Sequence, residues 1–274
     1  MSSWTINERE IPQAIVLISS ERLAKLKMIT GDERDAIILH QQMLIVAAAL
    51  MPVTALLEIC LRNTISERLR IVFGQPDWLQ NPPSPFVWRG EELDSIRRAK
   101  GQAQKAAYAK KTQYEKRLLD AKAFPEGIPI NLTHEKRAKG RQKQIQITMG
   151  QLIAQLTLTF WKRLLSSDYQ AALWDRGLKR IFPDQTIKRA NIAEKMEIIH
   201  QSRNRIAHHE PLYGKRLENT LFAIEYISSK FGEKLDGSHT LVEKMLEPYL
   251  GTLRTEANKL SLMMSQFLVV TETK

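Results

Sequence analysis

Cysteine is almost absent from this sequence of 274 residues, which contains only Cys60. No intrachain disulfide can form, and this suits a cytoplasmic protein. Apart from one adjacent histidine pair, no Cys or His residues stand at the spacing of zinc ligands, so we expect neither a metal site nor a cofactor. Residues Met1 to Glu10 hold no basic stretch leading into a long apolar run, so we expect no signal peptide.

Glycine and proline are also scarce, with 12 and 11 residues. Residues that favour helices, such as Leu, Ala, Lys, Glu and Gln, are common instead. Hydrophobic residues make up 43% of the chain, which is enough for a substantial core. We therefore predict an all-α protein, built as an up-and-down helical bundle of four or five core helices in a single domain of residues 1–274.

Acidic residues are too few to balance the basic ones, and the formal net charge is +11. The excess lies almost entirely in residues 97–143, where fourteen Lys and Arg face four Asp and Glu, a net charge of +10. A solvated surface laced with salt bridges would have more balanced charges. We therefore predict a basic helical insertion that contacts RNA phosphates. Its candidate RNA-binding residues are Lys110, Lys111, Lys116 and Arg117.

The most apolar part of the chain runs from Asp35 to Val72. Pro52 interrupts it, and Glu58 and Arg62 fall within the length that a membrane span would need. We therefore predict a core helix that is kinked or broken at Pro52, and no membrane association.

Further helices are expected along most of the remaining chain. The segment 75–89 contains four prolines and three large aromatic residues, which predicts a loop that packs its rings onto the core. The C-terminal helix, within 238–270, should bend at Pro248. The other expected helices are 11–28, 91–122, 148–165, 187–209 and 216–231.

One helix end concentrates polar side chains, in the run Gln201 to Tyr213. Arg203 falls on the apolar stripe of this helix, so its guanidinium needs an anion if it is buried. Asn204 stands four residues before His208, so its amide could orient that imidazole. Pro211 cannot continue a helix, which predicts an end near His209, where the helix dipole favours a protonated imidazole.

The pattern Arg203-Asn204-x3-His208 resembles the signature of HEPN domains, and the run from Arg203 to Leu212 resembles more specifically their Abi-like (abortive infection) branch. A second run, Leu56 to Asn63, is similar to a segment that this family places on an early core helix. It adds Glu58, Arg62 and Asn63 as supporting candidates, with Glu58 and Arg62 spaced to pair. Residues Arg34, Asp35 and His40 fit the looser spacing of the signature too, which we interpret as coincidence.

The resemblance implies a metal-independent endoribonuclease that acts as a toxin or phage-defence effector. His208 would be the general acid or base, Arg203 would bind the phosphate, and Asn204 would hold the imidazole or the phosphate. Supporting roles would fall to His209, Glu210 and Tyr213, and Arg205 would contact the RNA backbone.

Arg203 and His208 are five residues apart, about 140° on a helix, so the two groups of one chain cannot easily reach one phosphate oxygen. We therefore expect a homodimer with a composite site, which HEPN relatives also imply. An antitoxin protein is a further expected partner. Two alternatives are open, a HEPN-type domain that binds RNA or a nucleotide without cutting it, and a helical protein that contacts anionic lipid through residues 97–143.

Overall fold

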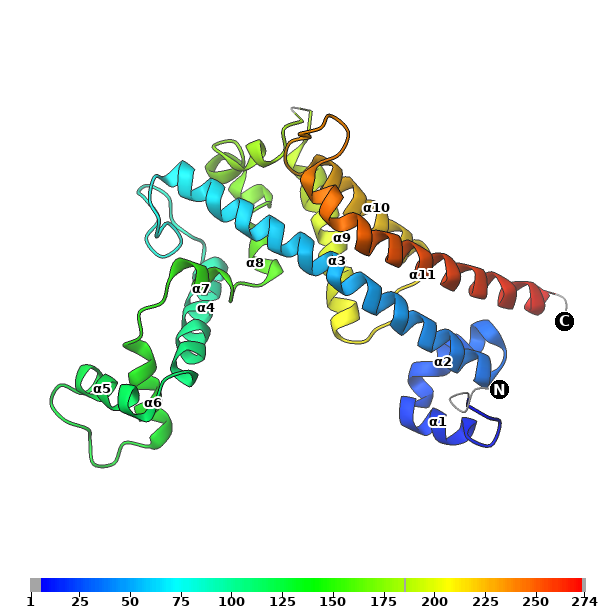
Figure 1. Ribbon diagram of the computed structural model, residues 1–274, viewed down its shortest axis with the longest axis horizontal. Helices are drawn as coiled ribbons and strands as arrows, with labels where there is room; N and C mark the ends of the chain where they lie inside the picture. Colours follow the sequence, from blue (N-terminus) through cyan, green and yellow to red (C-terminus); the bar gives the residue numbers. More distant parts are fainter. Residues whose placement is uncertain (1–5, 185, 273–274) are drawn as a thin grey trace. The chain divides into compact units, whose positions relative to one another are not determined.

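The computed structural model describes residues 6–184 and 186–272, the side chains of 268–272 excepted. Within these ranges every regular element is a helix and there is no strand, so the predicted all-α class is confirmed (Figure 1). The sequence predicts one domain, whereas the chain divides into two compact units. Unit 1 combines residues 1–60 with 182–274, and unit 2 comprises residues 61–181.

Unit 1 begins with two helices, α1 (Ile11–Ile18) and α2 (Ser20–Thr30), where the sequence predicts one. The prediction is wrong because Ser19 leaves the helical conformation with φ of 86°. Its hydroxyl oxygen accepts a hydrogen bond from the backbone N–H of Arg22, at 3.3 Å, and so caps the start of α2.

The long helix α3 (Glu33–Phe73) is continuous through Pro52, so of the two predicted outcomes, a kink or a break, the break is absent. A proline inside a helix costs about 3 kcal/mol, and burial of apolar side chains on both sides of it offsets this cost. Leu50 and Val53 are both fully buried. Of the described helices, α3 alone is long and apolar enough to cross a membrane by length and composition. One stripe of this helix, which includes Leu39 and Val46, is buried in the protein.

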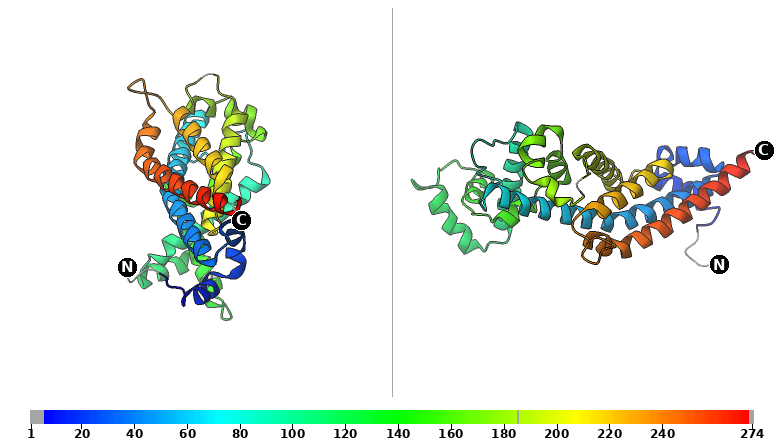
Figure 2. Two further views of the ribbon diagram at one scale, coloured as in Figure 1. Left: turned by 90° about the vertical axis from the view of Figure 1, so that its right-hand side faces the viewer. Right: turned by 90° about the horizontal axis from the view of Figure 1, so that it is seen from above.

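The rest of unit 1 is formed by α9 (Arg189–Ala207), α10 (Gly214–Lys230) and α11 (Leu241–Glu272). Helices α9 and α10 lie side by side, as Figures 1 and 2 show, and the buried hydroxyls of Ser202 and Thr220 are hydrogen-bonded between them at 2.7 Å. Helix α11 packs on α10 and α2, and Gln42 of α3 donates to the Glu256 carboxylate of α11 at 2.7 Å. The three predicted helices are confirmed, although Pro248 does not interrupt α11.

Unit 2 starts with the last part of α3 and the loop that follows it. The aromatic side chains of this loop are buried, as predicted for a cover over the core: Trp78, Phe86 and Trp88 are at most 9% exposed. The Phe86 and Trp88 rings meet edge to face, with centroids 4.8 Å apart. Near them, buried Glu92 accepts hydrogen bonds from the Tyr169 hydroxyl at 2.8 Å and the Arg163 guanidinium at 3.0 Å.

The remaining helices of unit 2 are shorter than α3, and one of them, at His134–Lys143, was not predicted from the sequence. They are α4 (Gly90–Ala109), α5 (Gln113–Ala123), α6 (His134–Lys143), α7 (Met149–Ile153) and α8 (Leu158–Arg163). The expected helix 91–122 is split because Thr112 forms a capping box with Glu115 and starts a new helix. The expected helix 148–165 is also split, since Thr157 is in extended conformation and begins α8. Short 3-10 and π turns follow, at Ser167–Tyr169, Gln170–Trp174 and Leu178–Ile181.

Candidate functional site

The polar run identified in the sequence forms the C-terminal end of α9, in unit 1. The helix ends at Ala207, and the predicted end near His209 is confirmed. His208 is the C-cap residue, and His209 takes a left-handed conformation with φ of 55°. The backbone N–H of Glu210 then donates to the carbonyl of Arg205 at 2.8 Å, which closes the helix end. The side chains of both histidines are therefore presented outside the last helical turn.

Arg205 holds the segment after the helix in place. Its guanidinium pairs with the Glu210 carboxylate at 2.9 Å and donates to the Pro211 carbonyl at 3.3 Å. From the sequence, Arg205 is expected to contact RNA and Glu210 to support the site. The structure gives both of them a role in fixing the turn that carries His208 and His209.

Asn204 contacts a different histidine from the expected one. Its side-chain nitrogen lies 3.2 Å from the Nε2 atom of His200, one helical turn earlier. The expected contact with His208, one turn after Asn204, does not form because His208 is the C-cap residue and has left the helix. Sequence reasoning missed His200, although its four-residue spacing from Asn204 is the same signal that pointed to His208.

Arg203 is half-buried, so its charge keeps access to solvent. Its guanidinium donates a weak hydrogen bond of 3.5 Å to the side-chain oxygen of Asn204. In the part of the chain that the structure describes, no carboxylate lies within 4.0 Å of its guanidinium. The expected internal anion is therefore not found, and the guanidinium can bind an external one.

A groove of about 650 Å³ separates the end of α9 from the start of α10. His200 and Asn204 line one side of it, and Lys215 and Arg216 stand on the α10 side. The two α10 cations are exposed. The groove therefore presents an imidazole, amides and cations together with the carboxylate of Glu197, a set suited to a polar ligand.

A second, much smaller hollow of about 20 Å³ lies between the end of α9 and α3. His40 and Leu44 of α3 line it together with Ile206, His209 and Pro211. His40, whose spacing from Arg34 we interpret as coincidence in the sequence, is thus a neighbour of the candidate site. The pKa of His40 is lowered, first by burial and then by the nearby positive charge of Arg22.

The other supporting candidates are more scattered. Tyr213 is half-buried and stands at the N-cap position of α10, without a capping hydrogen bond from its side chain. Glu58 is half-buried and lies fourteen residues after Leu44 on α3, about 21 Å along the helix at 1.5 Å per residue. Arg62 and Asn63 belong to unit 2, so pairing between Glu58 and Arg62 stays a prediction.

The basic segment of unit 2 is more ordered internally than its composition predicts. Asp120 of α5 accepts hydrogen bonds from Arg137 at 2.7 Å and from Arg141 of α6, whose side chain is only 9% exposed. Two of the fourteen cations thus share one carboxylate inside the fold. Lys116 lies over the Tyr108 ring at 5.0 Å.

A groove of about 580 Å³ in unit 2 carries three of the remaining cations. They are Lys110, Lys111 and Lys122, of which Lys111 also pairs with Glu115 at 2.7 Å. The floor is made of small apolar side chains, and no acidic residue lines the groove. Four glutamines complete its lining: Gln144, Gln146, Gln151 and Gln155. Of the other predicted RNA-binding residues, Arg117 is exposed outside this groove.

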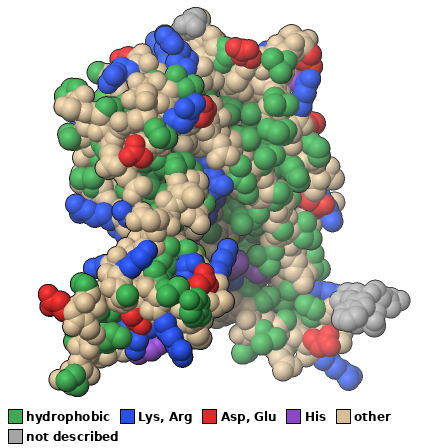
Figure 3. Space-filling model, turned by 60° about the vertical axis from the view of Figure 1, so that its left-hand side comes forward, with side chains coloured by type: hydrophobic (Ala, Val, Ile, Leu, Met, Phe, Trp, Pro, Cys, Tyr) green, Lys and Arg blue, Asp and Glu red, His purple; other side chains and the backbone are tan. Residues whose placement is uncertain are grey.

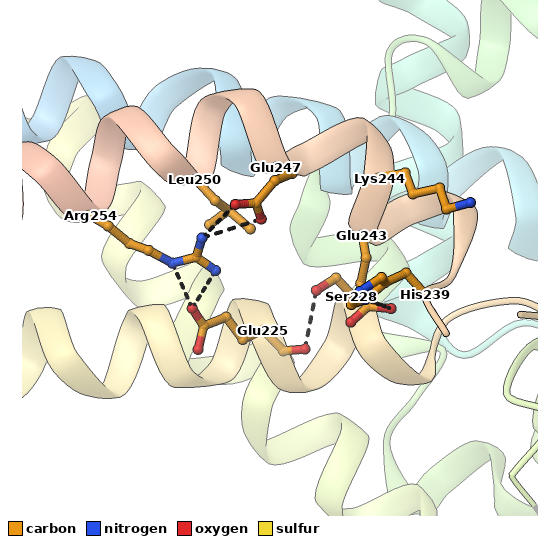
Figure 4. A pocket seen from close by; sticks show the side chains of 8 residues that line it. All are labelled: Glu225, Ser228, His239, Glu243, Lys244, Glu247, Leu250 and Arg254. Carbon is orange, nitrogen blue, oxygen red and sulfur yellow. Dashed lines mark hydrogen bonds and ion pairs between the residues drawn. The ribbon is translucent and has the colours of Figure 1, made fainter. Parts of the chain in front are cut away.

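A hollow between α10 and α11 is lined by charged residues that largely satisfy one another (Figure 4). Arg254 bridges Glu225 at 2.8 Å and Glu247 at 3.0 Å. His239 stands 3.8 Å from Glu243. This arrangement ties the two helices together and leaves few groups for a ligand.

In the described residues there is no group of three or more His, Cys, Asp or Glu side chains that could hold a metal ion. The comparisons with known proteins add no identification, because no family model, no curated protein and no solved structure matches the chain.

Proposed function

We propose that this protein is a metal-independent endoribonuclease of the HEPN type, similar to the Abi-like proteins. The observation that carries the proposal is the half-buried guanidinium of Arg203, beside Asn204 and without a carboxylate partner among the described residues, one turn before His208. An unneutralised arginine at a rim is suited to a phosphate, and a nearby exposed imidazole is suited to proton transfer.

RNA cleavage can proceed from these groups without a metal. The ribose 2′-hydroxyl attacks the neighbouring phosphorus, and the bond from phosphorus to the 5′-oxygen breaks, which leaves a 2′,3′-cyclic phosphate. Arg203 stabilises the negative charge on the phosphate during this step. His208 transfers a proton, because an imidazole can be protonated or neutral near pH 7. Asn204 binds a phosphate oxygen or holds His200 in place.

The basic groove of unit 2 supports RNA as the substrate. Its lysines suit phosphates, and its apolar floor with amides at the rim suits an unpaired base. The formal net charge of +11 agrees with a polyanionic ligand, and Figure 3 shows Lys and Arg side chains spread over one face of the molecule. The same observation favours the second candidate function, an RNA-binding protein that does not cut, and a cleavage assay separates the two.

A homodimer with a composite site is part of the proposal. Three exposed side chains of α3 in unit 1 follow one another at seven-residue spacing: Ile38, Ile45 and Ile59 are 41%, 46% and 41% exposed, and Pro52 stands between the last two. A repeat of seven places them along one seam of the helix, as in helix pairs that pack at a two-fold axis. The seam offers a surface to a second copy, and the composite site itself rests on the spacing of Arg203 and His208.

The biological role that follows is that of a toxin or phage-defence effector, restrained by an antitoxin protein or a trigger. The informative experiment is to sequence RNA ends in cells after brief induction of the wild-type chain and of Arg203→Ala. We expect new RNA ends with the wild type and none with the variant. Ends that are the same in both would reject the proposed active site.

A further inference from the structure

The small hollow between α3 and the end of α9 brings a third helix to the candidate site. His40 and Leu44 meet Ile206, His209 and Pro211 there. The hollow has room for about one water molecule, so His40 stands against the signature and not in a separate ligand pocket. His40 is half-buried, which leaves one part of its imidazole accessible.

Arg22 of α2 joins the same cluster. Its guanidinium donates a hydrogen bond of 2.5 Å to the backbone carbonyl of His209. His209 lies just beyond the C-cap of α9, so this bond ties the turn after the helix to α2. It also holds a positive charge near His40. The turn is fixed independently by the Arg205–Glu210 ion pair.

The charged and titratable groups that face His40 therefore come from two other elements. They are Arg22 of α2 and, beyond the end of α9, His209 and Glu210. The neighbours of His40 one turn away on α3 itself are apolar: Ala36, Ile37, Met43 and Leu44. Burial and the Arg22 charge lower the pKa of His40, so this imidazole is neutral at physiological pH and can accept a proton.

The chemistry requires a group of this kind. In an in-line displacement at phosphorus, the attacking and leaving oxygens lie on opposite sides, so the proton acceptor and the proton donor must also be on opposite sides. One imidazole cannot occupy both positions in a single step. His208 supplies one, and a second proton-transfer group is needed from another direction.

We propose that His40 is the proton acceptor for RNA cleavage and that Arg22 is its positioning residue. This inference rests on the proposed function. The proton of the ribose 2′-hydroxyl moves to the neutral His40 imidazole while the 2′-oxygen forms its bond to phosphorus. The bond from phosphorus to the 5′-oxygen breaks, and that oxygen takes a proton from protonated His208. The products are a 2′,3′-cyclic phosphate and a 5′-hydroxyl, and no other reactant is consumed.

The first test is the pH dependence of cleavage in excess EDTA. The wild-type rate should rise with pH through a value below the ordinary pKa of imidazole, because only neutral His40 accepts the proton. His40→Gln should lower the rate by about 10²–10⁴-fold and remove this acid limb. His239→Gln, which changes an exposed histidine at the start of α11, is the matched control and should leave both rate and profile unchanged.

Arg22 variants separate positioning from a merely structural role. Arg22→Gln removes the positive charge that lowers the His40 pKa, so the acid limb should move to higher pH. Arg22→Lys keeps the charge and should keep the limb in place. A limb at the same pH in both variants would reject the role of Arg22.

An NMR binding measurement on the wild-type protein tests the inference even if His40→Gln does not fold. The imidazole signals of His40 in the wild-type protein are followed by NMR while an RNA oligonucleotide with 2′-deoxy sugars, which cannot react, is added. We expect those signals to shift on binding. Unshifted signals, or a His40→Gln enzyme with wild-type rate and profile, would overturn this inference and leave the proposed function standing. A wild-type protein that does not cut RNA would reject both.

Discussion

Removal of the Asp120 carboxylate should open the basic segment of unit 2. Its side chain is 12% exposed and binds both Arg137 and Arg141, whose side chains are 35% and 9% exposed. In Asp120→Asn the shape is kept, but the Arg141 guanidinium remains buried without a counter-charge. Removing one partner of a buried ion pair destabilises a protein by about 3–5 kcal/mol. Because Arg137 is partly exposed, we expect a loss of folding free energy near the lower limit, about 3 kcal/mol.

The effect should be measured locally, because a chain of two compact units need not unfold in one step. Amide hydrogen exchange across α5 and α6 should become faster by about 10²-fold in Asp120→Asn, the factor that corresponds to about 3 kcal/mol. The matched control is Asp94→Asn, which removes the partner of Arg97 from a pair that is 73% and 60% exposed. Exposed pairs contribute at most about 1 kcal/mol, so exchange should change little.

The pH dependence of the same protection gives an independent check. The two guanidinium groups lower the pKa of Asp120 in the folded protein. A carboxyl with a lowered folded pKa stabilises the fold above its unfolded value, about 3.9, and the stabilisation is lost as the pH falls below it. The difference between wild type and Asp120→Asn should therefore be constant near neutral pH and shrink below about pH 4. Equal exchange in Asp120→Asn and Asp94→Asn would refute the structural role of Asp120.

Two further predictions concern binding and assembly. RNA affinity should fall with salt, by roughly 0.7 in log K per unit of log salt for each phosphate contacted, and the slope should flatten when the four predicted basic residues are changed to Gln. These are Lys110, Lys111, Lys116 and Arg117. A fluorescence titration at several salt concentrations measures the slope, and an unchanged slope would place RNA elsewhere. In a composite dimer, Arg203→Ala mixed with His208→Ala should regain part of the cleavage rate, because some mixed dimers contain one intact pair. A protein that is monomeric by light scattering yet fully active would contradict that assembly.

Helix content and most buried faces could be predicted from the sequence, because apolar periodicity is a property of many residues at once. The end of α9 could also be predicted, since Pro211 excludes a helix there whatever surrounds it. Helix breaks were harder to predict. Ser19 and Thr112 start new helices through single side-chain caps, a local effect of about 1 kcal/mol that composition does not reveal. Pro52 shows the reverse case, where burial on both sides outweighs the local preference.

The candidate site was predicted in part for a similar reason. The sequence identifies the residues of one helix end, Arg203, Asn204 and His208, because their spacing is local. It cannot show that His40 and Arg22, far away in the chain, meet this end, since that contact depends on how α2 and α3 pack against α9. The sequence also does not show that Arg205 forms an ion pair with Glu210.

The central claim is that this helix end cleaves RNA without a metal, and a cleavage assay with purified protein in excess EDTA tests it most directly. We predict cleavage by the wild type with 2′,3′-cyclic phosphate or 3′-phosphate ends. Arg203→Ala and His208→Ala should each remove it while circular dichroism shows an intact fold, since loss of a positioned acid or base costs about 10²–10⁴ in rate. Strict dependence on Mg²⁺, or full activity in His208→Ala, would contradict the account.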